Sequence, residues 1–346
     1  MQIGKHSRKL AALRKATKHG NLTSDGLLPI EGPILLEEAQ RSGIEIVDVF
    51  RKAGTPMPAV EPDAIFDVSE EAFKTVQDTE HSQGIIATVR PRQYTLGDIF
   101  AVSPELVIVL GRLQDPGNVG TILRIGESFG ATGCIALRGT ASFYNGKVVR
   151  ASAGSVFRFP HIGSETLDET VSLLRSRRIG LIGTSPNAAD TIEQWDWRKP
   201  SAILIGNEGQ GLGPKELATC DKVLRVPHKG TVESLNSAIA AAIILYEASS
   251  RDGHKGSECK PARGGLACSV QAMVARPSRY SVGQQGSVLS VCTIHQRVDP
   301  LGAVTVLESV RVRRLSDGFR SAVVDVLSAC RGHDAHSARL PRWSSG

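Results

Sequence analysis

The sequence contains no apolar run long enough to span a bilayer, and its first residues, MQIGKHSRKL, lack the apolar core of a signal peptide. Cysteine is sparse, with six residues in 346, and no two of them form a C-x-x-C pair. These absences argue against a membrane protein, a secreted disulfide-rich protein and a zinc or redox module. We therefore expect a soluble, cytoplasmic protein that is long enough for two domains.

The sequence also lacks a cluster of His, Asp and Glu with the spacing of metal ligands, so it predicts no metal site. A G-x-G-x-x-G fingerprint with an acidic residue downstream is missing as well. Its absence argues against a dehydrogenase or another enzyme of that kind with a nucleotide cofactor, which is the rival interpretation among enzymes.

The formal charge of +6 is distributed unevenly. Residues 253–346 hold 13 Lys and Arg against 6 Asp and Glu, whereas residues 1–252 hold 28 against 29. Residues 1–22 nevertheless contain six basic residues and no acidic one: Lys5, Arg8, Lys9, Arg14, Lys15 and Lys18. Because phosphate binding depends on clustered cations, this segment is either a basic arm for nucleic acid or a solvated, frayed terminus.

The first ninety residues predict a short basic helix over residues 8–20 and then a small α/β unit. Gly43 ends the first helix of this unit, and Ser69 begins the second with two acidic residues in its first turn. The expected helices and strands of the unit cover residues 29–43, 44–50, 69–77 and 84–89. Residues 90–103 contain few apolar residues and predict a linker.

From residue 106 onward, strand-like and helix-like segments alternate, which is typical of a parallel sheet covered by helices on both faces. The expected strands are 106–110, 133–137, 180–184, 202–206 and 223–226, and the expected helices are 119–129, 167–177 and 234–249. Beyond residue 252 no motif is found, although residues 288–294 and 304–312 alternate like strands. An extra domain, a disordered basic extension and an aberrant tail all stay open for this part.

Three segments in this order place Gly and small polar residues beside apolar runs: DPGNVGTILRIGESFG at 115–130, ILIGNEGQGLG at 203–213 and VPHKGTVESLNSAIAAAIILYE at 226–247. Such positions expose main-chain groups to a ligand at the end of a strand. Together the segments resemble the three motifs of the SpoU (TrmH-type) family of RNA ribose 2'-O-methyltransferases, which use S-adenosylmethionine. The resemblance covers about residues 10–251.

This resemblance implies an α/β fold with a parallel sheet and a C-terminal trefoil knot (SPOUT), preceded by a small α/β RNA-binding domain. The pieces EGPILLEEAQRSGIEI and DTEHSQGIIATV resemble the substrate-binding domain of such enzymes. The implied organisation is a basic arm (1–22), an RNA-binding domain (23–90), a linker (91–104), a knotted methyltransferase domain (105–252) and an unassigned tail (253–346). A homodimer is implied as well, with ribosomal RNA favoured over transfer RNA as substrate.

A ribose hydroxyl is a poor nucleophile near neutral pH, so a base or a cation that stabilises the forming oxyanion is expected. The resemblance assigns this role to Arg124, and we favour charge stabilisation because a guanidinium stays protonated. The other residues that it places in the catalytic site are Asn118, Glu208, Ser234 and Asn236. We expect Glu208 to pair with a nearby Arg, and we expect Ser234 to cap the last helix.

The resemblance also implies cofactor contacts through Gly206 and through the main chain of Val226 and Leu235. Thr184, at the end of a strand, is a further candidate on the cofactor side. Lys147 and Arg150 are either phosphate contacts or part of a solvated turn. A transfer RNA methyltransferase and an RNA-binding relative without catalysis are the alternatives, and the presence of all five candidate catalytic residues argues against the second.

Overall fold

The computed structural model describes residues 2–228 and 234–251, together with three strands further along the chain. The chain divides into two units, residues 1–255 and 256–346. In the second unit, antiparallel strands cover Leu289–Val298 (β13), Val304–Arg313 (β14) and Val323–Val326 (β15). β13 and β14 confirm the strand-like alternation. The parts of residues 253–346 other than these three strands lie outside the described residues. Every described helix is too short or too polar to cross a bilayer.

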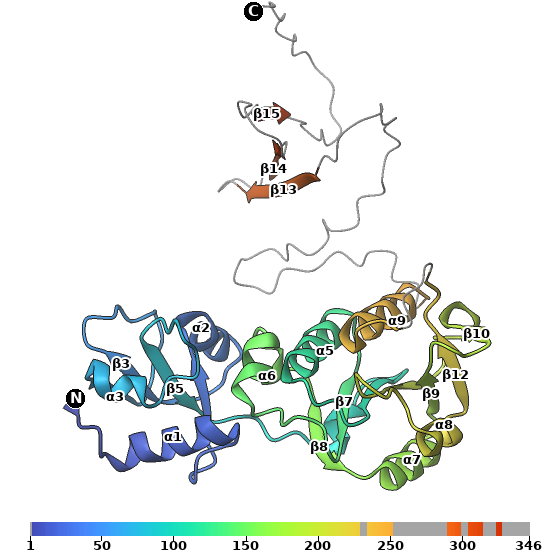
Figure 1. The fold of residues 1–346 in the computed structure, drawn as a ribbon, viewed down its shortest axis with the longest axis horizontal. Coiled ribbons are helices and arrows are strands. Elements are labelled where there is room, and N and C mark those ends of the chain that lie inside the picture. The colour runs from blue at the N-terminus through green and yellow to red at the C-terminus, as the bar shows by residue number, and fades with distance from the viewer. Residues whose placement is uncertain (1, 229–233, 252–288, 299–303, 314–322, 327–346) are drawn as a thin grey trace, which may run out of the picture. The chain divides into compact units, whose positions relative to one another are not determined.

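The N-terminal part of the first unit is a five-stranded sheet in the order β1-β4-β3-β5-β2 (Figure 1). Its strands are Gln2–Ile3 (β1), Leu28–Glu31 (β2), Ile46–Lys52 (β3), Ala64–Val68 (β4) and Ile85–Val89 (β5). Its helices are Arg8–His19 (α1), Pro33–Arg41 (α2) and Glu70–Lys74 (α3). The expected helix over residues 29–43 was wrong in its first turn, because Leu28–Glu31 instead pairs with β5 as an antiparallel strand.

The helix α1 packs against this sheet and is not a loose arm. Leu10 and Leu13 are fully buried beneath it. Ser7 caps its first turn by accepting a hydrogen bond from the Leu10 N–H, and Gly20 ends it in the left-handed conformation. Apolar burial and both caps therefore favour a folded N-terminus over a frayed one.

The second part is a seven-stranded sheet in the order β10-β12-β9-β11-β6-β7-β8, in which all neighbouring strands are parallel. Its strands are Leu106–Leu110 (β6), Gly133–Leu137 (β7), His161–Glu165 (β8), Gly180–Thr184 (β9), Asp190–Thr191 (β10), Ser201–Ile205 (β11) and Lys222–Arg225 (β12). Its helices are Leu96–Ile99 (α4), Pro116–Ser128 (α5), Gly146–Ala151 (α6), Leu167–Ser176 (α7), Pro214–Thr219 (α8) and Ser237–Arg251 (α9), with short 3-10 turns at Ser155–Phe157 and Ile192–Gln194.

Both faces of this sheet are apolar, and alternate residues of each strand pack on opposite faces. In β6, Ile108 and Leu110 belong to the core beneath α5, α6 and α9, whereas Val107 and Val109 belong to the core beneath α7. Figure 1 shows α5, α6 and α9 together on one face of the sheet and α7 with α8 on the other. The parallel α/β fold and the doubly covered sheet predicted from the sequence are thus confirmed.

The segment between the two parts contains its own short helix, α4. Thr95 and Asp98 form a capping box at its start, and Ile99 is fully buried in the core beneath α7. Before it, the Tyr94 hydroxyl donates a hydrogen bond of 3.0 Å to the carbonyl of Phe157. The second half of the expected linker therefore packs on the seven-stranded sheet.

Arg158 joins the two parts of the unit through its guanidinium. It forms ion pairs with Glu38 on α2 at 3.0 Å and with Glu127 on α5 at 2.8 Å, and it donates to the Ser42 hydroxyl at 2.8 Å. Arg92 adds a hydrogen bond of 2.8 Å to the Ser42 carbonyl. The guanidinium of Arg158 thus connects α2 of the N-terminal part to the helix α5.

Replacing Arg158 by Ala should destabilise the protein by about 1–2 kcal/mol, because the carboxylates of Glu38 and Glu127 would lose their shared cation. The expected drop in the thermal unfolding midpoint is about 2–8 °C, measured by calorimetry on the full chain. Arg198→Ala is the matched control, since Arg198 is 73% exposed and, among the described residues, pairs with the nearby Asp196 alone. Equal midpoints for the two variants would contradict the joining role.

Candidate active site

The three motifs meet at one edge of the seven-stranded sheet. The loops of the first and second motifs follow β6 and β11, which pair in register from Leu106 with Ser201 to Leu110 with Ile205. The third motif follows β12, which is separated from β11 by β9 alone. Because these strands are parallel, their carboxyl ends lie on the same side, where ligands bind in open α/β sheets.

Three predicted residues, one from each motif, form a hydrogen-bonded set at this edge. The Asn118 side-chain amide donates to the Glu208 carboxylate at 3.2 Å, and the Asn236 amide donates to the Asn118 oxygen at 3.1 Å. Asn118 is 8% exposed, whereas the other two side chains are open to solvent. The chain of amide and carboxylate groups therefore runs from a buried residue of α5 to the surface.

Glu208 also accepts hydrogen bonds from the backbone N–H groups of Gln114 at 3.4 Å and Asp115 at 3.3 Å. The expected pairing of Glu208 with an arginine was wrong for the part of the chain that the structure describes. Its carboxylate instead holds the loop that begins α5, where backbone donors and the helix N-terminus favour a negative charge. Arg112 forms an ion pair with Glu216 at 2.7 Å.

Asn236, and not Ser234, caps the last helix. The Asn236 oxygen accepts hydrogen bonds from the N–H groups of Ala238 at 2.9 Å and Ile239 at 3.2 Å, as an N-cap residue does. The helix accordingly begins at Ser237, later than the expected start at Ser234. Ser234 lies exposed just before it and just after residues 229–233, which are outside the described part.

The loop of the second motif closes on itself. Asn207 and Gly211 exchange two backbone hydrogen bonds of 3.2 and 2.9 Å. A Cβ at Gly206 would lie 2.4 Å from the carbonyl carbon of Gly211, so only glycine allows this closure. The Asn207 side chain donates to the Arg112 carbonyl at 2.9 Å and holds the second loop against the first.

Arg124 lies on α5 about 9 Å along the helix from Asn118, by the rise of 1.5 Å per residue. Its side chain is exposed, and among the described residues it has no hydrogen bond or ion pair. The helices α5 and α9 run in the same direction, because Asn118 contacts Asn236 near their starts and Phe129 stacks against Tyr246 further along. Arg124 is therefore presented by a fixed helix but is not part of the hydrogen-bonded set.

One site residue, Asp115, was not anticipated from the sequence. Asp115 caps α5 through the Gly117 N–H and forms an ion pair of 3.0 Å with Lys147, the residue left open between a phosphate contact and a solvated turn. The Lys147 ammonium and the Gly117 N–H hold the pKa of Asp115 below its usual range. The D-P-G sequence at 115–117 was the available signal, since Asp before Pro is a common helix start. Arg150 forms its ion pair elsewhere, with Asp78.

The residues expected to hold a cofactor lie at adjacent strand ends. Thr184 ends β9 and donates a hydrogen bond of 3.3 Å to the Leu204 carbonyl of β11, while Gly206 and Val226 directly follow β11 and β12. Ser237, the first residue of α9, has a buried hydroxyl without a hydrogen-bond partner among the described residues. Adjacent main-chain groups at three strand ends fit a ligand that carries several polar groups, as S-adenosylmethionine does. No group of metal-ligating side chains occurs within the described ranges.

The comparisons with known proteins agree with this geometry. The profile of the SpoU rRNA Methylase family matches residues 105–246. The chain is 32% identical over 219 residues to the 23S rRNA (guanosine(2553)-2'-O)-methyltransferase RlmP of Bacillus subtilis, which covers 63% of this chain and 86% of that protein. The chain belongs to the SpoU rRNA methylase family.

Two further comparisons cover a larger share of this chain. The 23S rRNA (uridine(2479)-2'-O)-methyltransferase of Streptomyces viridochromogenes is 30% identical over 248 residues, covering 68% of this SpoU chain and 84% of that protein. The SpoU methyltransferase AviRb from Streptomyces viridochromogenes, crystallised with the cofactor AdoMet, has the same fold, with a TM-score of 0.64 at 24% identity over 71% of this chain and 98% of that one.

In this SpoU family member, Glu208→Ala should loosen the loop that begins α5. The loss of about 1 kcal/mol of hydrogen bonding to the amides of Gln114 and Asp115 should speed their hydrogen exchange about fivefold. Exchange measured by mass spectrometry on peptides that cover residues 112–118 checks this, with peptides over β7 as the internal control. Unchanged exchange in 112–118 would show that Glu208 does not hold the loop.

Proposed function

We propose that this chain transfers a methyl group from S-adenosylmethionine to a ribose 2'-hydroxyl of ribosomal RNA. The observation that carries the proposal is the hydrogen-bonded set of Asn118, Glu208 and Asn236, which unites the three motifs at the carboxyl edge of the sheet. Both named relatives methylate 23S rRNA, one at a guanosine and the other at a uridine. These names favour ribosomal over transfer RNA, and they show that the family does not restrict the base.

When bound, S-adenosylmethionine supplies a methyl group that is already activated as a sulfonium. The main chain at Gly206, Val226 and Leu235 would hold it, with Thr184 on the same side. This assignment is supported by the position of the first two residues and of Thr184 at three adjacent strand ends. The hydrogen bonds between Asn207 and Gly211 fix the main chain next to Gly206, which favours a preformed contact there.

Arg124 is the residue that we assign to the ribose hydroxyl. Its guanidinium carries a positive charge that stabilises the 2'-oxygen as the hydroxyl loses its proton. Its exposure and the lack of a described side-chain partner support this role, since no carboxylate of the chain has to be displaced when RNA binds. Asn118, Glu208 and Asn236 orient the loops around it, and Ser234 lies at the same edge of the sheet.

Arg124→Ala should lower methyl transfer at least about 100-fold, as loss of a charge-stabilising donor commonly does. Transfer from radiolabelled S-adenosylmethionine to bacterial rRNA and tRNA, tested separately, measures the effect and selects the substrate class. RNA affinity should change little, and Arg175→Ala on α7 is the matched control. Label from wild-type and Arg124→Ala protein alike would contradict the role, and no label from wild-type protein would favour an RNA-binding relative without catalysis.

We also propose that the first unit contains the trefoil knot of SPOUT methyltransferases and comprises a basic N-terminal segment, an RNA-binding domain and a methyltransferase domain. The return of the chain from β12, near one edge of the sheet, to α9 beside α5 supports the knot. The separate five-stranded sheet of the N-terminal part supports the division.

A homodimer through α9 is proposed on the same basis. Ile239, Ile243 and Tyr246 are exposed by 55%, 36% and 50% and follow the i, i+4, i+7 spacing of one helix face. An apolar stripe of this kind on a soluble domain marks a protein interface. The same helix contacts α5, so a partner seated on it would lie close to the candidate active site.

Ile243→Lys should convert the dimer to monomers, because a buried lysine at the centre of the stripe has no partner for its charge. Size-exclusion chromatography with light scattering on the full chain measures the mass. Ile34→Lys on α2, where Ile34 is 67% exposed, is the control and should leave the mass unchanged. A monomeric wild-type protein, or equal masses for both variants, would overturn the α9 interface.

A further inference from the structure

We propose that the outward face of α1 binds phosphates of the RNA substrate and directs the RNA toward the start of α5. This inference rests on the proposed function, and it names a surface of this chain and not a further activity. The surface, called here the α1 stripe, consists of Arg8, Lys15 and Lys18. It is distinct from the hydrogen-bonded set at the sheet edge, because it lies on the N-terminal part of the unit.

The basic residues of the N-terminal segment fall into two groups. Lys5 pairs with Glu71 at 2.6 Å, and Lys9 pairs with Asp48, a buried carboxylate of β3, at 2.6 Å. Arg14 donates a hydrogen bond to Thr75 at 2.8 Å. Each of these three side chains already has a partner within the protein, and together they hold the N-terminal segment on its sheet.

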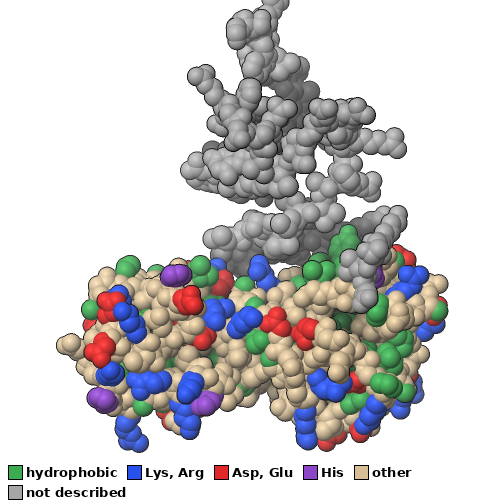
Figure 2. Space-filling model, in the orientation of Figure 1, with side chains coloured by type: hydrophobic (Ala, Val, Ile, Leu, Met, Phe, Trp, Pro, Cys, Tyr) green, Lys and Arg blue, Asp and Glu red, His purple; other side chains and the backbone are tan. Residues whose placement is uncertain are grey.

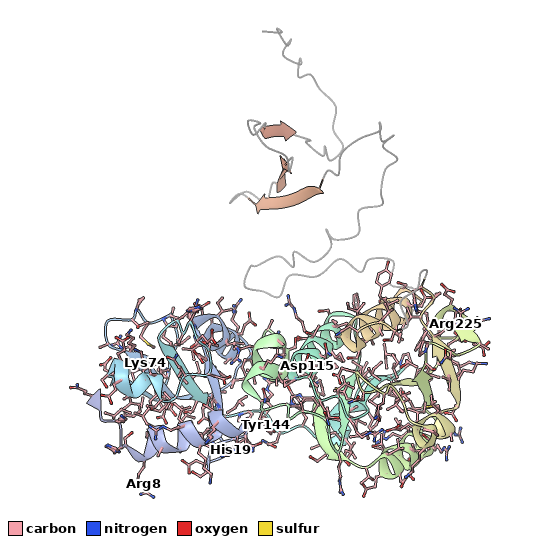
Figure 3. The ribbon with its side chains drawn as sticks, viewed as in Figure 1. Arg8, His19, Lys74, Asp115, Tyr144 and Arg225 are labelled. Atoms are coloured by element: carbon pink, nitrogen blue, oxygen red, sulfur yellow. The ribbon has the colours of Figure 1, made fainter. Side chains whose placement is uncertain are left out.

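The other three cations, those of the α1 stripe, are exposed, and their side chains have no partner within the described part of the chain. At 100° per residue they lie within a sector of roughly 80° on the helix, opposite Leu10 and Leu13. They extend over about 15 Å of the helix axis at 1.5 Å per residue. Figure 3 shows Arg8 pointing away from the body of the molecule.

The helix contributes no acidic residue to offset this charge, since its sequence is RKLAALRKATKH. Figure 2 shows Lys, Arg and His side chains gathered along the lower edge of the N-terminal part, over α1. A row of fixed cations with no interspersed carboxylates attracts a polyanion more strongly than the average charge of the chain indicates. Because α1 is already folded, RNA binding does not carry the loss of conformational entropy that ordering a disordered arm would require.

The α1 stripe leads toward the candidate active site. The helix ends at Gly20, where an added Cβ would lie 2.8 Å from the side-chain amide of Asn145, the N-cap residue of α6. Two residues further, Lys147 forms its ion pair with Asp115 at the start of α5. The end of α1 therefore lies close to the start of α6, and Lys147 of α6 contacts the start of the first motif. This course of the chain toward the first motif favours RNA over an anionic membrane as the partner.

The test compares two triple variants of the full chain with the same change in charge. R8Q/K15Q/K18Q removes the α1 stripe, and R175Q/R178Q/K199Q removes three exposed cations around α7 and before β11. Affinity for a fluorescein-labelled 30-nucleotide single-stranded RNA is measured between 50 and 300 mM KCl. With about 0.7 counterions released per phosphate contact, the slope of log K against log salt should fall by about 2 in the stripe variant alone.

The two variants are then compared in methyl transfer to bacterial rRNA. The stripe variant should raise the KM for RNA about tenfold while the affinity for S-adenosylmethionine and the unfolding midpoint stay at wild-type values. Equal salt slopes and equal KM values in the two triple variants would overturn the α1 stripe. If the salt slope falls in the stripe variant alone but wild-type protein transfers no methyl group, the proposed function fails and the α1 stripe stands. If wild-type protein does not bind the RNA, the stripe is overturned.

Discussion

The contact between Glu208 and the loop before α5 joins parts of the chain that are about 90 residues apart. One carboxylate accepts from two backbone N–H groups and from Asn118, so three donors at the start of a helix share a single acceptor. The geometry of the candidate site depends on this contact, because α5 also carries Arg124. A small shift of the helix start would move the guanidinium by a similar amount, and oriented catalysis tolerates little displacement.

The five inner strands of the catalytic sheet were predicted from their apolar sequences, whereas the edge strands β8 and β10 were not. Residues 106–110, 133–137 and 180–184 form strands with the predicted bounds. The sheet buries both of its faces, so every position of such a strand favours an apolar residue and the boundaries are sharp. Leu28–Glu31 was different, because Pro29 and the helix-like periodicity that follows gave no sign of its partner strand β5. Pairing across 57 residues is a tertiary property that local patterns do not contain.

For the site, the sequence identified the residue types but not their partners. Asn118, Glu208 and Asn236 were predicted to belong to the catalytic site, and hydrogen bonds join Asn118 to each of the other two. The expected partner of Glu208 was wrong, because backbone donors compete with guanidinium groups for a carboxylate and no sequence pattern records them. The cap of α9 was missed by two residues for a related reason. Both Ser234 and Asn236 are good caps, and contact with Asn118 favours the second.

The N-terminal segment shows how one composition serves two purposes. From the sequence its six cations are equivalent, and the choice between a basic arm and a frayed terminus stays open. The structure separates them by helical phase, since Leu10 and Leu13 select the face that is buried and Lys9 follows that face to Asp48. The cations on the remaining face have no ion-pair partner among the described residues, so pairing adds nothing to the stability of the fold. Mutual repulsion between these cations lowers the stability of the folded protein. A polyanion that binds these unpaired cations does not have to displace carboxylates from them. It therefore binds them more favourably than it would bind paired cations.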